Sequence, residues 1–307
     1  MDLNVLLGLL NLLGAGAAAA WLAAVAHTAW SLLHPPKRTY AWALHRQLPG
    51  DPGELDPALD YEPFMFRGAR RELPAWRVTG RNPSGPVVVM THGWGSSRLG
   101  GLIRLPACAA HASAVILWDL PGQGEAGGIA RMGADEHLDL IALLGTLGDV
   151  PIVLFGWSLG AGVSLRAALD GTDRFDIRAV ICEAPYARAA TPARNVIRLR
   201  GMPHRLNLRP AMWLIGSRLG VGPSWRGFAR DRIASSLGDL PLTVIHGDAD
   251  PVCPIDDGRR IADAAPNGRL VTIEGGGHNN LWTEPGFAAD SAQAVQAAIR
   301  EATDESA

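Results

Sequence analysis

Six short runs that fit β-strands, separated by segments long enough to form helices, constrain the fold of this 307-residue chain more than any other feature. Four of them are apolar, namely Val87–Thr91, Ala114–Trp118, Ile152–Phe155 and Ala179–Cys182, and two further strands are Leu242–His246 and Arg269–Ile273. Runs that are apolar throughout and rich in β-branched residues are typical of strands buried on both faces. Helix-length segments between them indicate crossover connections. We therefore predict an α/β protein with a mostly parallel, doubly wound sheet.

Three further segments complete the predicted fold. Glu62–Arg67 and Pro74–Thr79 have the pattern of a short antiparallel strand pair, and Glu284–Ala302 that of a closing amphipathic helix. The segment from about 187 to 237 breaks the alternation of strands and helices. We interpret it as a small helical cap, inserted over one edge of the sheet.

The N-terminus has the composition of a transmembrane helix. There are 34 consecutive residues without a formal charge between Asp2 and Lys37. The 24 residues from Leu3 to Ala26 span roughly 36 Å as a helix, enough for a hydrocarbon core of ~30 Å. Pro35 and Pro36 are expected to end the helix, because proline disfavours helix continuation. Trp21 and Trp30 are placed as interfacial aromatic residues.

Two alternatives to a membrane anchor remain open. Ala24-Val25-Ala26 resembles a signal-peptide cleavage site, but the preceding region carries Asp2 and no basic residue, whereas signal peptides begin with positive charge. A buried helix of a soluble protein is the third reading, and it is disfavoured by the lack of a polar face. Of the 28 basic residues only Lys37 is lysine, a bias typical of a GC-rich bacterium. The basic residues follow the helix, so we expect a single-pass protein of a bacterial inner membrane, with its main domain in the cytoplasm.

The predicted organisation has four parts. Residues 1–34 are the anchor, 35–60 a linker rich in Pro and Asp, 61–302 the α/β domain with its cap, and 303–307 a C-terminal tail. The hydrophobic fraction of 48% excludes wholesale disorder, and a net charge of −2 gives no sign of nucleic-acid binding. The three cysteines are far apart and form no C-x-x-C motif, which indicates neither a disulfide framework nor a cysteine zinc site.

The candidate reactive residues follow predicted strands. Gly156-Trp157-Ser158-Leu159-Gly160 lies between a predicted strand and a helical segment, the context of a nucleophile elbow, in which a sharp turn exposes the Ser158 hydroxyl. A serine hydrolase also needs a carboxylate and a histidine. Gly247–Pro251 follows the fifth predicted strand of this series and contains Asp248 and Asp250, and Gly275–His278 follows the sixth.

Five motifs in order carry a resemblance to a known family. They are His92–Ser97 (HGWGSS), Asp119–Gly124 (DLPGQG), Gly156–Gly160 (GWSLG), Gly247–Pro251 (GDADP) and Gly277-His278. With them the chain resembles the α/β-hydrolase superfamily from about residue 61 to 299. A looser resemblance is to membrane-anchored ABHD-type and serine-aminopeptidase-like hydrolases.

The resemblance implies roles for five residues. Ser158 would be the nucleophile, His278 the general base and then acid, and Asp250 the carboxylate of a catalytic triad. The backbone N–H groups of Trp94 and Leu159 would form the oxyanion hole, and each such donor is typically worth ~3–4 kcal/mol. His92 and His246 recur in the superfamily as structural residues.

Alternatives stay open at several of these positions. Asp248 could replace Asp250 as the carboxylate, although it fits a turn-capping residue better. Glu183, at the end of another predicted strand, is a further candidate. There are non-catalytic alternatives as well. Ser158 could be a buried structural serine, and His278 could be a surface histidine whose hydrogen bonds are purely structural. We expect Cys253 to behave as a small hydrophobic residue, because nothing near it suggests an electropositive setting.

We therefore predict a serine hydrolase that cleaves an ester or thioester, with an acyl chain on its small-molecule or lipid substrate. The mechanism needs no cofactor and no metal. A peptidase or amidase is the alternative enzyme, since amide and ester hydrolysis share the same geometry. A non-catalytic scaffold is the alternative from another class.

Charge is unevenly distributed along the chain. Residues 187–232 contain ten arginines and one acid, a net charge of +9, which leaves −11 for the remainder. The same segment holds Met212–Ile215, Leu219 and Trp225. Arginines beside large apolar residues suit a surface that contacts anionic lipids, or a site for an anionic substrate. The alternative is a solvated lid whose arginines pair with the acidic body.

Overall fold

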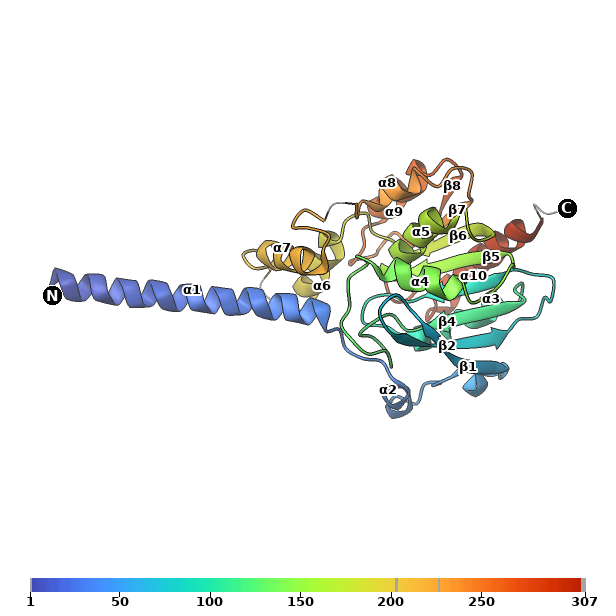
Figure 1. The fold of residues 1–307 in the computed structure, drawn as a ribbon, viewed down its shortest axis with the longest axis horizontal. Coiled ribbons are helices and arrows are strands. Elements are labelled where there is room, and N and C mark those ends of the chain that lie inside the picture. Colours follow the sequence, from blue (N-terminus) through green and yellow to red (C-terminus); the bar gives the residue numbers. More distant parts are fainter. Residues whose placement is uncertain (1, 202–203, 226, 305–307) are drawn as a thin grey trace.

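The computed structural model describes residues 2–201, 204–225 and 227–304. Eight strands form one sheet in the order β1-β2-β4-β3-β5-β6-β7-β8 (Figure 1). The strands are β1 (Tyr61–Arg67), β2 (Glu72–Thr79), β3 (Val87–Thr91), β4 (Ala114–Trp118), β5 (Ile152–Trp157), β6 (Ile177–Glu183), β7 (Leu242–Gly247) and β8 (Gly268–Ile273).

The strand directions confirm the predicted mostly parallel sheet. β2 is antiparallel to both β1 and β4, whereas β4, β3, β5, β6, β7 and β8 are parallel to one another. The register places Val88 opposite both Val115 of β4 and Val153 of β5. Every residue of β3, β4 and β5 is buried, as their continuous apolar sequences predict.

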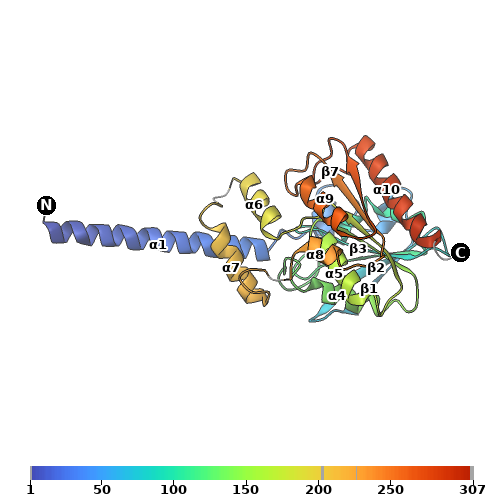
Figure 2. The same ribbon diagram turned by 90° about the horizontal axis from the view of Figure 1, so that it is seen from above.

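Helices cover both faces of the sheet (Figures 1 and 2). α4, α5, α8 and α9 lie on one face, and α3 and α10 on the other. The bounds are α1 (Leu3–Leu33), α2 (Tyr40–His45), α3 (Leu105–Ala109), α4 (Glu136–Leu144), α5 (Leu159–Gly171), α6 (Ala190–Leu199), α7 (Leu208–Leu219), α8 (Arg230–Ala234), α9 (Ile255–Ala264) and α10 (Pro285–Asp304), with the 3-10 helices η1 (Pro52–Glu54) and η2 (Arg98–Gly101).

The two faces have separate apolar cores, and β5 contributes to both. Leu154 packs in the core beneath α4, α5 and α9, and the next residue, Phe155, packs in the core beneath α3 and α10. Successive strand residues point to opposite faces, so a strand buried on both sides needs no polar alternation. This arrangement explains why the alternation of apolar runs in the sequence predicts the layers.

A third apolar cluster joins the inserted segment to the end of α1. Ala29 and Leu32 of α1 pack with Ile197 of α6 and Ile215 of α7. Asn207 donates a hydrogen bond from Nδ2 to Thr28 Oγ1 across this contact, at 2.7 Å. α6 and α7 of the predicted insertion therefore lie beside the end of α1, beyond the carboxyl ends of the parallel strands (Figures 1 and 2). The last helix of the predicted insertion, α8, instead packs on the sheet face with α5 and α9.

α1 extends away from the body of the molecule (Figure 1). Among the described residues, α1 is the one helix that is long enough and apolar enough to cross a membrane, judged by length and composition. Its stretch Leu3–Ala23 is exposed along its whole length, and Val25 is the first buried residue. The exposed 21 residues span roughly 32 Å, close to the ~30 Å of a bilayer core.

The segment 35–60 differs from the loop that its composition predicts. It contains α2 and η1, and the Asp51 side chain accepts hydrogen bonds from the N–H groups of Gly53 and Glu54 at the start of η1. Glu54 in turn accepts a hydrogen bond from the Gly50 N–H, at 2.8 Å. These local contacts give the linker a defined shape. At the other terminus α10 continues to Asp304, and the rest of the predicted tail lies outside the described residues.

Candidate active site

Ser158 lies on the turn between β5 and α5, in a backbone conformation that L-residues rarely adopt. Its φ is 55° and its ψ is −110°. The glycines on either side are required by space: a Cβ on Gly160 would lie 1.9 Å from the Thr91 carbonyl oxygen, and one on Gly156 would lie 2.3 Å from the backbone of Gly160. The strained turn is thus held by close packing of neighbouring backbone, and it presents the serine at the carboxyl end of β5.

The structure brings Ser158, His278 and Asp250 together from three separate segments. The Ser158 Oγ lies 3.2 Å from His278 Nε2, and His278 Nδ1 donates to Asp250 Oδ2 at 2.7 Å. The hydroxyl, the imidazole and the carboxylate therefore form one hydrogen-bonded chain. Such a chain lets a histidine accept the serine proton while the carboxylate fixes its orientation.

Asp250 is buried and fully engaged in hydrogen bonds. Its Oδ1 accepts from the N–H groups of Val252 and Cys253, at 2.7 and 2.8 Å. Burial alone would raise its pKa, but the hydrogen bonds from His246, His278 and the Cys253 backbone outweigh burial and hold the pKa well below 3.8. The group is therefore ionised at neutral pH.

The alternative acids are occupied elsewhere. Asp248 is exposed and accepts a hydrogen bond from the Gly275 N–H at 2.7 Å, as a turn-capping residue does. Glu183 is buried, forms an ion pair with Arg104 and accepts a hydrogen bond from the Trp282 indole at 2.7 Å. Neither carboxylate contacts His278.

His278 is the group whose protonation state matters for this chemistry. Burial would lower the pKa of its imidazole, but the neighbouring Cys253 and Asp250 together raise that pKa above 6.5. Burial raises the pKa of the Cys253 thiol, so this thiol is neutral near pH 7. The Asp250 carboxylate is then the neighbour whose negative charge favours the imidazolium.

The two other histidines of the motifs form hydrogen bonds with backbone groups. His92 is buried, contacts the Gly93 carbonyl through Nδ1 at 2.8 Å and accepts from the Leu120 N–H through Nε2 at 3.0 Å. Burial lowers the pKa of His92 to about 4, so its ring is neutral. His246 donates through Nε2 to the Cys253 carbonyl, at 2.8 Å.

The backbone N–H groups of Trp94 and Leu159 have no hydrogen-bond acceptor among the residues that the structure describes. Both residues line the same cavity as Ser158, and Leu159 is the first residue of α5. N–H groups at the start of a helix lack an intrahelical partner and favour negative charge. The Trp94 side chain is held by α1, because its indole donates to the Leu32 carbonyl at 2.9 Å.

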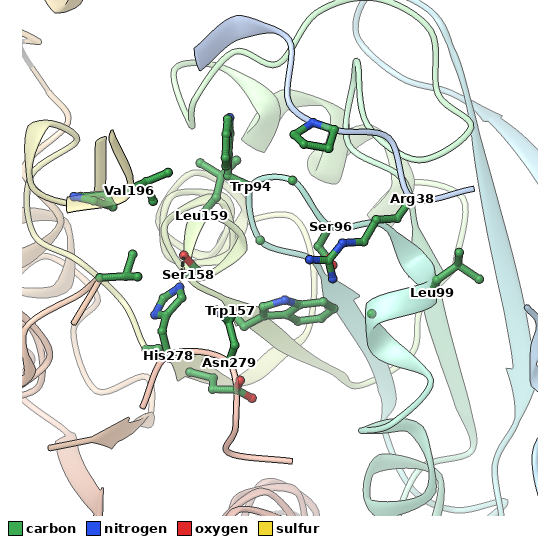
Figure 3. A pocket seen from close by; sticks show the side chains of 18 of the residues that line it. Arg38, Trp94, Ser96, Leu99, Trp157, Ser158, Leu159, Val196, His278 and Asn279 are labelled. Carbon is green, nitrogen blue, oxygen red and sulfur yellow. Dashed lines mark hydrogen bonds between the residues drawn. The ribbon is translucent and has the colours of Figure 1, made fainter. Parts of the chain in front are cut away.

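A cavity of about 960 Å³ opens over Ser158. Figure 3 shows Trp94, Leu159 and Val196 on one part of its wall and Ser96, Leu99 and Arg38 on another. Its lining comes from the sheet ends, from α6 of the insertion, and from the segment after α1. The sequence indicated the part of the wall near the motifs but not the contribution of residues 32–55.

Arg230 is a buried residue near this site that sequence reasoning assigned to a surface. Its guanidinium lies 3.7 Å from the ring centre of Tyr186 and within 3.5 Å of the carbonyl oxygens of Ser158 and Leu159. A Cβ on Gly162 would lie 1.8 Å from Arg230 Nε, so this glycine makes room for the guanidinium. In the sequence, Gly162 inside α5 was the one signal that another group approaches the helix backbone closely.

Asp250, Cys253 and His278 also form a group whose ligand atoms lie within 4.8 Å of one another. These atoms are already engaged: Asp250 and His278 are hydrogen-bonded to each other, and the Cys253 thiol has a raised pKa. A metal ion there would have to displace a proton and break that hydrogen bond. The donors present therefore fit a hydrogen-bonded chain better than a metal site.

Comparison with known proteins identifies the family. The sheet order and the serine on a strained strand-to-helix turn define a hydrolase of the α/β class. The model of the alpha/beta hydrolase family matches residues 88–291, more than half of the chain. The chain belongs to this family.

A curated relative narrows the type of reaction. The pimeloyl-[acyl-carrier protein] methyl ester esterase of Chromobacterium violaceum is 27% identical over 228 residues, which cover 63% of this chain and 87% of that protein. Together with the family match, this relative supports an enzyme with esterase-type hydrolase activity.

Solved structures share the fold. The esterase Pf2001 of Pyrococcus furiosus superposes with a TM-score of 0.64 at 18% identity, over 88% of this chain and 99% of that one. A membrane phospholipase A described as a bacterial virulence factor superposes with a TM-score of 0.58 at 15% identity, over 97% of this chain and 99% of that one. At these identities the likeness concerns the fold alone.

Proposed function

We propose that this enzyme is a membrane-anchored serine hydrolase that cleaves a carboxylic ester or thioester bearing an acyl chain. The observation that carries the proposal is the hydrogen-bonded chain from Ser158 Oγ through His278 to Asp250. The serine lies in a cavity large enough for a substrate and at the end of a strand, where this fold places its nucleophile.

The proposed reaction uses only these groups. His278 accepts the Ser158 proton as Oγ attacks the carbonyl carbon, and the N–H groups of Trp94 and Leu159 stabilise the negative charge on the carbonyl oxygen. His278 then gives its proton to the leaving alcohol or thiol, which leaves an acyl group on Ser158. A water molecule, deprotonated by His278, releases the acid and restores the serine.

The preference for an acyl substrate rests on the cavity and on the relative. Apolar side chains of α6 and of the loops around Ser158, among them Val196, Leu199 and Val252, line much of the cavity. The Chromobacterium relative carries in its name an ester of an acyl chain. Both favour a carboxylic ester with an apolar acyl part over a peptide.

The proposed membrane location rests on α1 and on the insertion. α1 exposes an apolar stretch of the length of a bilayer core. Beside its end, the insertion exposes arginines that have no acidic partner among the described residues, together with Leu206 and Trp213, which are 77% and 58% exposed. These exposed arginines are Arg194, Arg198, Arg200, Arg205, Arg209 and Arg218. Such a surface suits contact with anionic headgroups.

Labelling with a fluorophosphonate probe tests the catalytic part of the proposal. We expect the full chain in detergent to become labelled, and Ser158→Ala to lose both labelling and ester hydrolysis. Ser217→Ala, which removes an exposed hydroxyl on α7, is the matched control and should be labelled like the wild type. Absence of labelling in the folded wild type would instead support a non-catalytic scaffold.

A substrate panel then separates the reaction types. We expect p-nitrophenyl esters of increasing acyl length and an acyl thioester to be hydrolysed faster than aminoacyl amides. Faster cleavage of the amides would contradict the ester assignment and favour the peptidase alternative.

A further inference from the structure

The cavity over Ser158 carries an unbalanced positive charge. Four arginines and one glutamate are among the residues that line it, and the glutamate, Glu183, is paired with Arg104. The three other arginines, Arg38, Arg46 and Arg200, have no acidic group within 4 Å in the part of the chain that the structure describes. A largely apolar cleft that keeps three unpaired guanidinium groups suits an anionic amphiphilic ligand.

Two of these arginines form a cluster on the segment that follows α1. Arg38 and Arg46 lie against the ring of Trp42, with guanidinium carbons 5.1 and 4.5 Å from its centre. Partial burial and the neighbouring Arg46 lower the pKa of Arg38, as expected where like charges are held close together. An anion bound beside these guanidinium groups would offset their positive charge.

Arg38 lies on a different side of the nucleophile from the apolar part of the cavity. Figure 3 shows its side chain reaching into the cavity toward Ser96, on the side of Ser158 opposite Val196 of α6. Arg46 lines the same cavity. An ester bound at Ser158 can therefore place its acyl chain toward α6 and its alcohol part toward Arg38. The cleft thus has one end suited to a hydrocarbon chain and one suited to an anion.

From this arrangement we infer that Arg38 and Arg46 form a phosphate subsite, which selects carboxylic esters whose alcohol part carries a phosphate group. The inference rests on the proposed function, since it describes the other end of the same substrate. Phosphate is favoured because it carries several acceptor oxygens and more than one negative charge, which two guanidinium groups can share. The phosphate itself is not attacked: the carboxylic ester bond breaks, and a fatty acid and a phosphate-bearing alcohol are released.

A matched pair of substrates tests the subsite. Lauroyl-glycerol phosphate and lauroyl-glycerol have the same acyl chain and the same ester bond, and they differ only in the phosphate group. The full chain is assayed in nonionic detergent micelles, with release of laurate as the readout. We expect a higher kcat/KM for the phosphate-bearing ester, and a smaller preference at high salt.

Variants assign the preference to the two arginines. In R38A/R46A the ratio of kcat/KM for the phosphate-bearing ester to that for the neutral ester should fall by roughly 10- to 100-fold, the range expected on losing charge-assisted hydrogen bonds. R38K/R46K keeps the charge and should retain part of the ratio. Arg81→Ala removes an exposed arginine before β3, at the opposite end of the strands, and should leave the ratio unchanged.

The same assay distinguishes a small phosphate ester from a phospholipid as the substrate, and it also gives the results that would contradict the inference. A preference that also holds for soluble butyryl-glycerol phosphate supports a small phosphate ester as substrate, and one confined to the long chain supports a phospholipid. Equal kcat/KM for both esters in the wild type, or a ratio unchanged in R38A/R46A, would overturn the inference. In either case, hydrolysis that depends on Ser158 would leave the proposed function standing.

Discussion

The residues around Ser158 illustrate how environment divides similar groups into different roles. Asp248 and Asp250 are two positions apart, yet one is exposed at a turn and the other is buried against His278. Only the buried carboxylate can act on the imidazole at short range, because the low dielectric around it strengthens the interaction.

The two aspartates should therefore respond very differently to substitution. Asp250→Asn should lower kcat by about 10³- to 10⁴-fold, because the amide neither fixes the histidine tautomer nor stabilises the imidazolium. Asp248→Asn keeps an acceptor oxygen for the Gly275 N–H and should retain most of the activity. Rates of hydrolysis of a p-nitrophenyl ester by the two variants provide the measurement.

The pH profile gives a second readout of the same contact. The proposed general base, His278, can accept a proton only when its imidazole is neutral, so activity should fall as the pH drops through its pKa. Because this pKa is raised, the acid limb of kcat/KM should lie above pH 6.5 in the wild type. In Asp250→Asn the carboxylate charge is gone, so the limb of the residual activity should move to lower pH. A limb that does not move would show that Asp250 does not set the pKa of His278.

At the scale of elements, segments remote from the motifs build the walls of the candidate active site. The end of α1 supplies the carbonyl that holds the Trp94 indole, and residues after it line the cavity. The last part of the insertion turns back under the elbow, where Arg230 contacts backbone carbonyls of Ser158 and Tyr186. The insertion is therefore partly a cap and partly a support of the elbow.

Removal of the Arg230 guanidinium should destabilise the protein. Arg230→Met keeps an apolar side chain but removes the donor to the buried Tyr186 carbonyl oxygen and the contact with the Tyr186 ring. The free energy of unfolding should therefore fall by about 3 kcal/mol. Arg232→Met, at an exposed site of α8, should change it by less than about 0.5 kcal/mol. Denaturant unfolding of both variants makes the comparison, and equal values would contradict a supporting role for Arg230.

At the scale of the whole molecule, the cavity lies at the end of α1 that joins the body, where Leu32 lines it. α1 leaves the body on the same side as α6 and α7 (Figures 1 and 2). If α1 spans a bilayer, the insertion with its exposed arginines faces the headgroups, and the cavity beside it receives substrate from the membrane surface. For such an anchored protein, the positive-inside rule applied to Lys37, Arg38 and Arg46 predicts that this surface is on the cytoplasmic side.

Cysteine labelling tests this topology. Cys108, Cys182 and Cys253 are all buried, so the native chain should react little with a maleimide. Ser84→Cys introduces a thiol in an exposed turn before β3. An impermeant maleimide should label this variant only after the inner membrane is permeabilised. Labelling in cells with an intact inner membrane would place the domain outside and contradict the proposed orientation.

Much of the fold could be predicted because its signals are local. The runs at residues 87–91 and 114–118 coincide with β3 and β4, and the glycines beside Ser158 predict the turn that the structure contains. Helix α2 was missed because its six residues lie in a segment rich in Pro and Asp. A short helix depends on tertiary contacts more than on propensity, so its own sequence gave little signal.

The sequence by itself determined the α/β class, the order of the strands along the chain, the strained turn at Ser158 and the long apolar helix, because each depends on residues close together in the chain. Only the tertiary structure decided which carboxylate reaches His278, where the arginines of the insertion point, and that the segment after α1 lines the cavity. Those outcomes depend on contacts between residues far apart in sequence, and on whether a charged side chain finds a partner, solvent or a buried carbonyl. From charge alone we predicted that the ten arginines of the insertion lie on one surface, but in the structure Arg230 is buried.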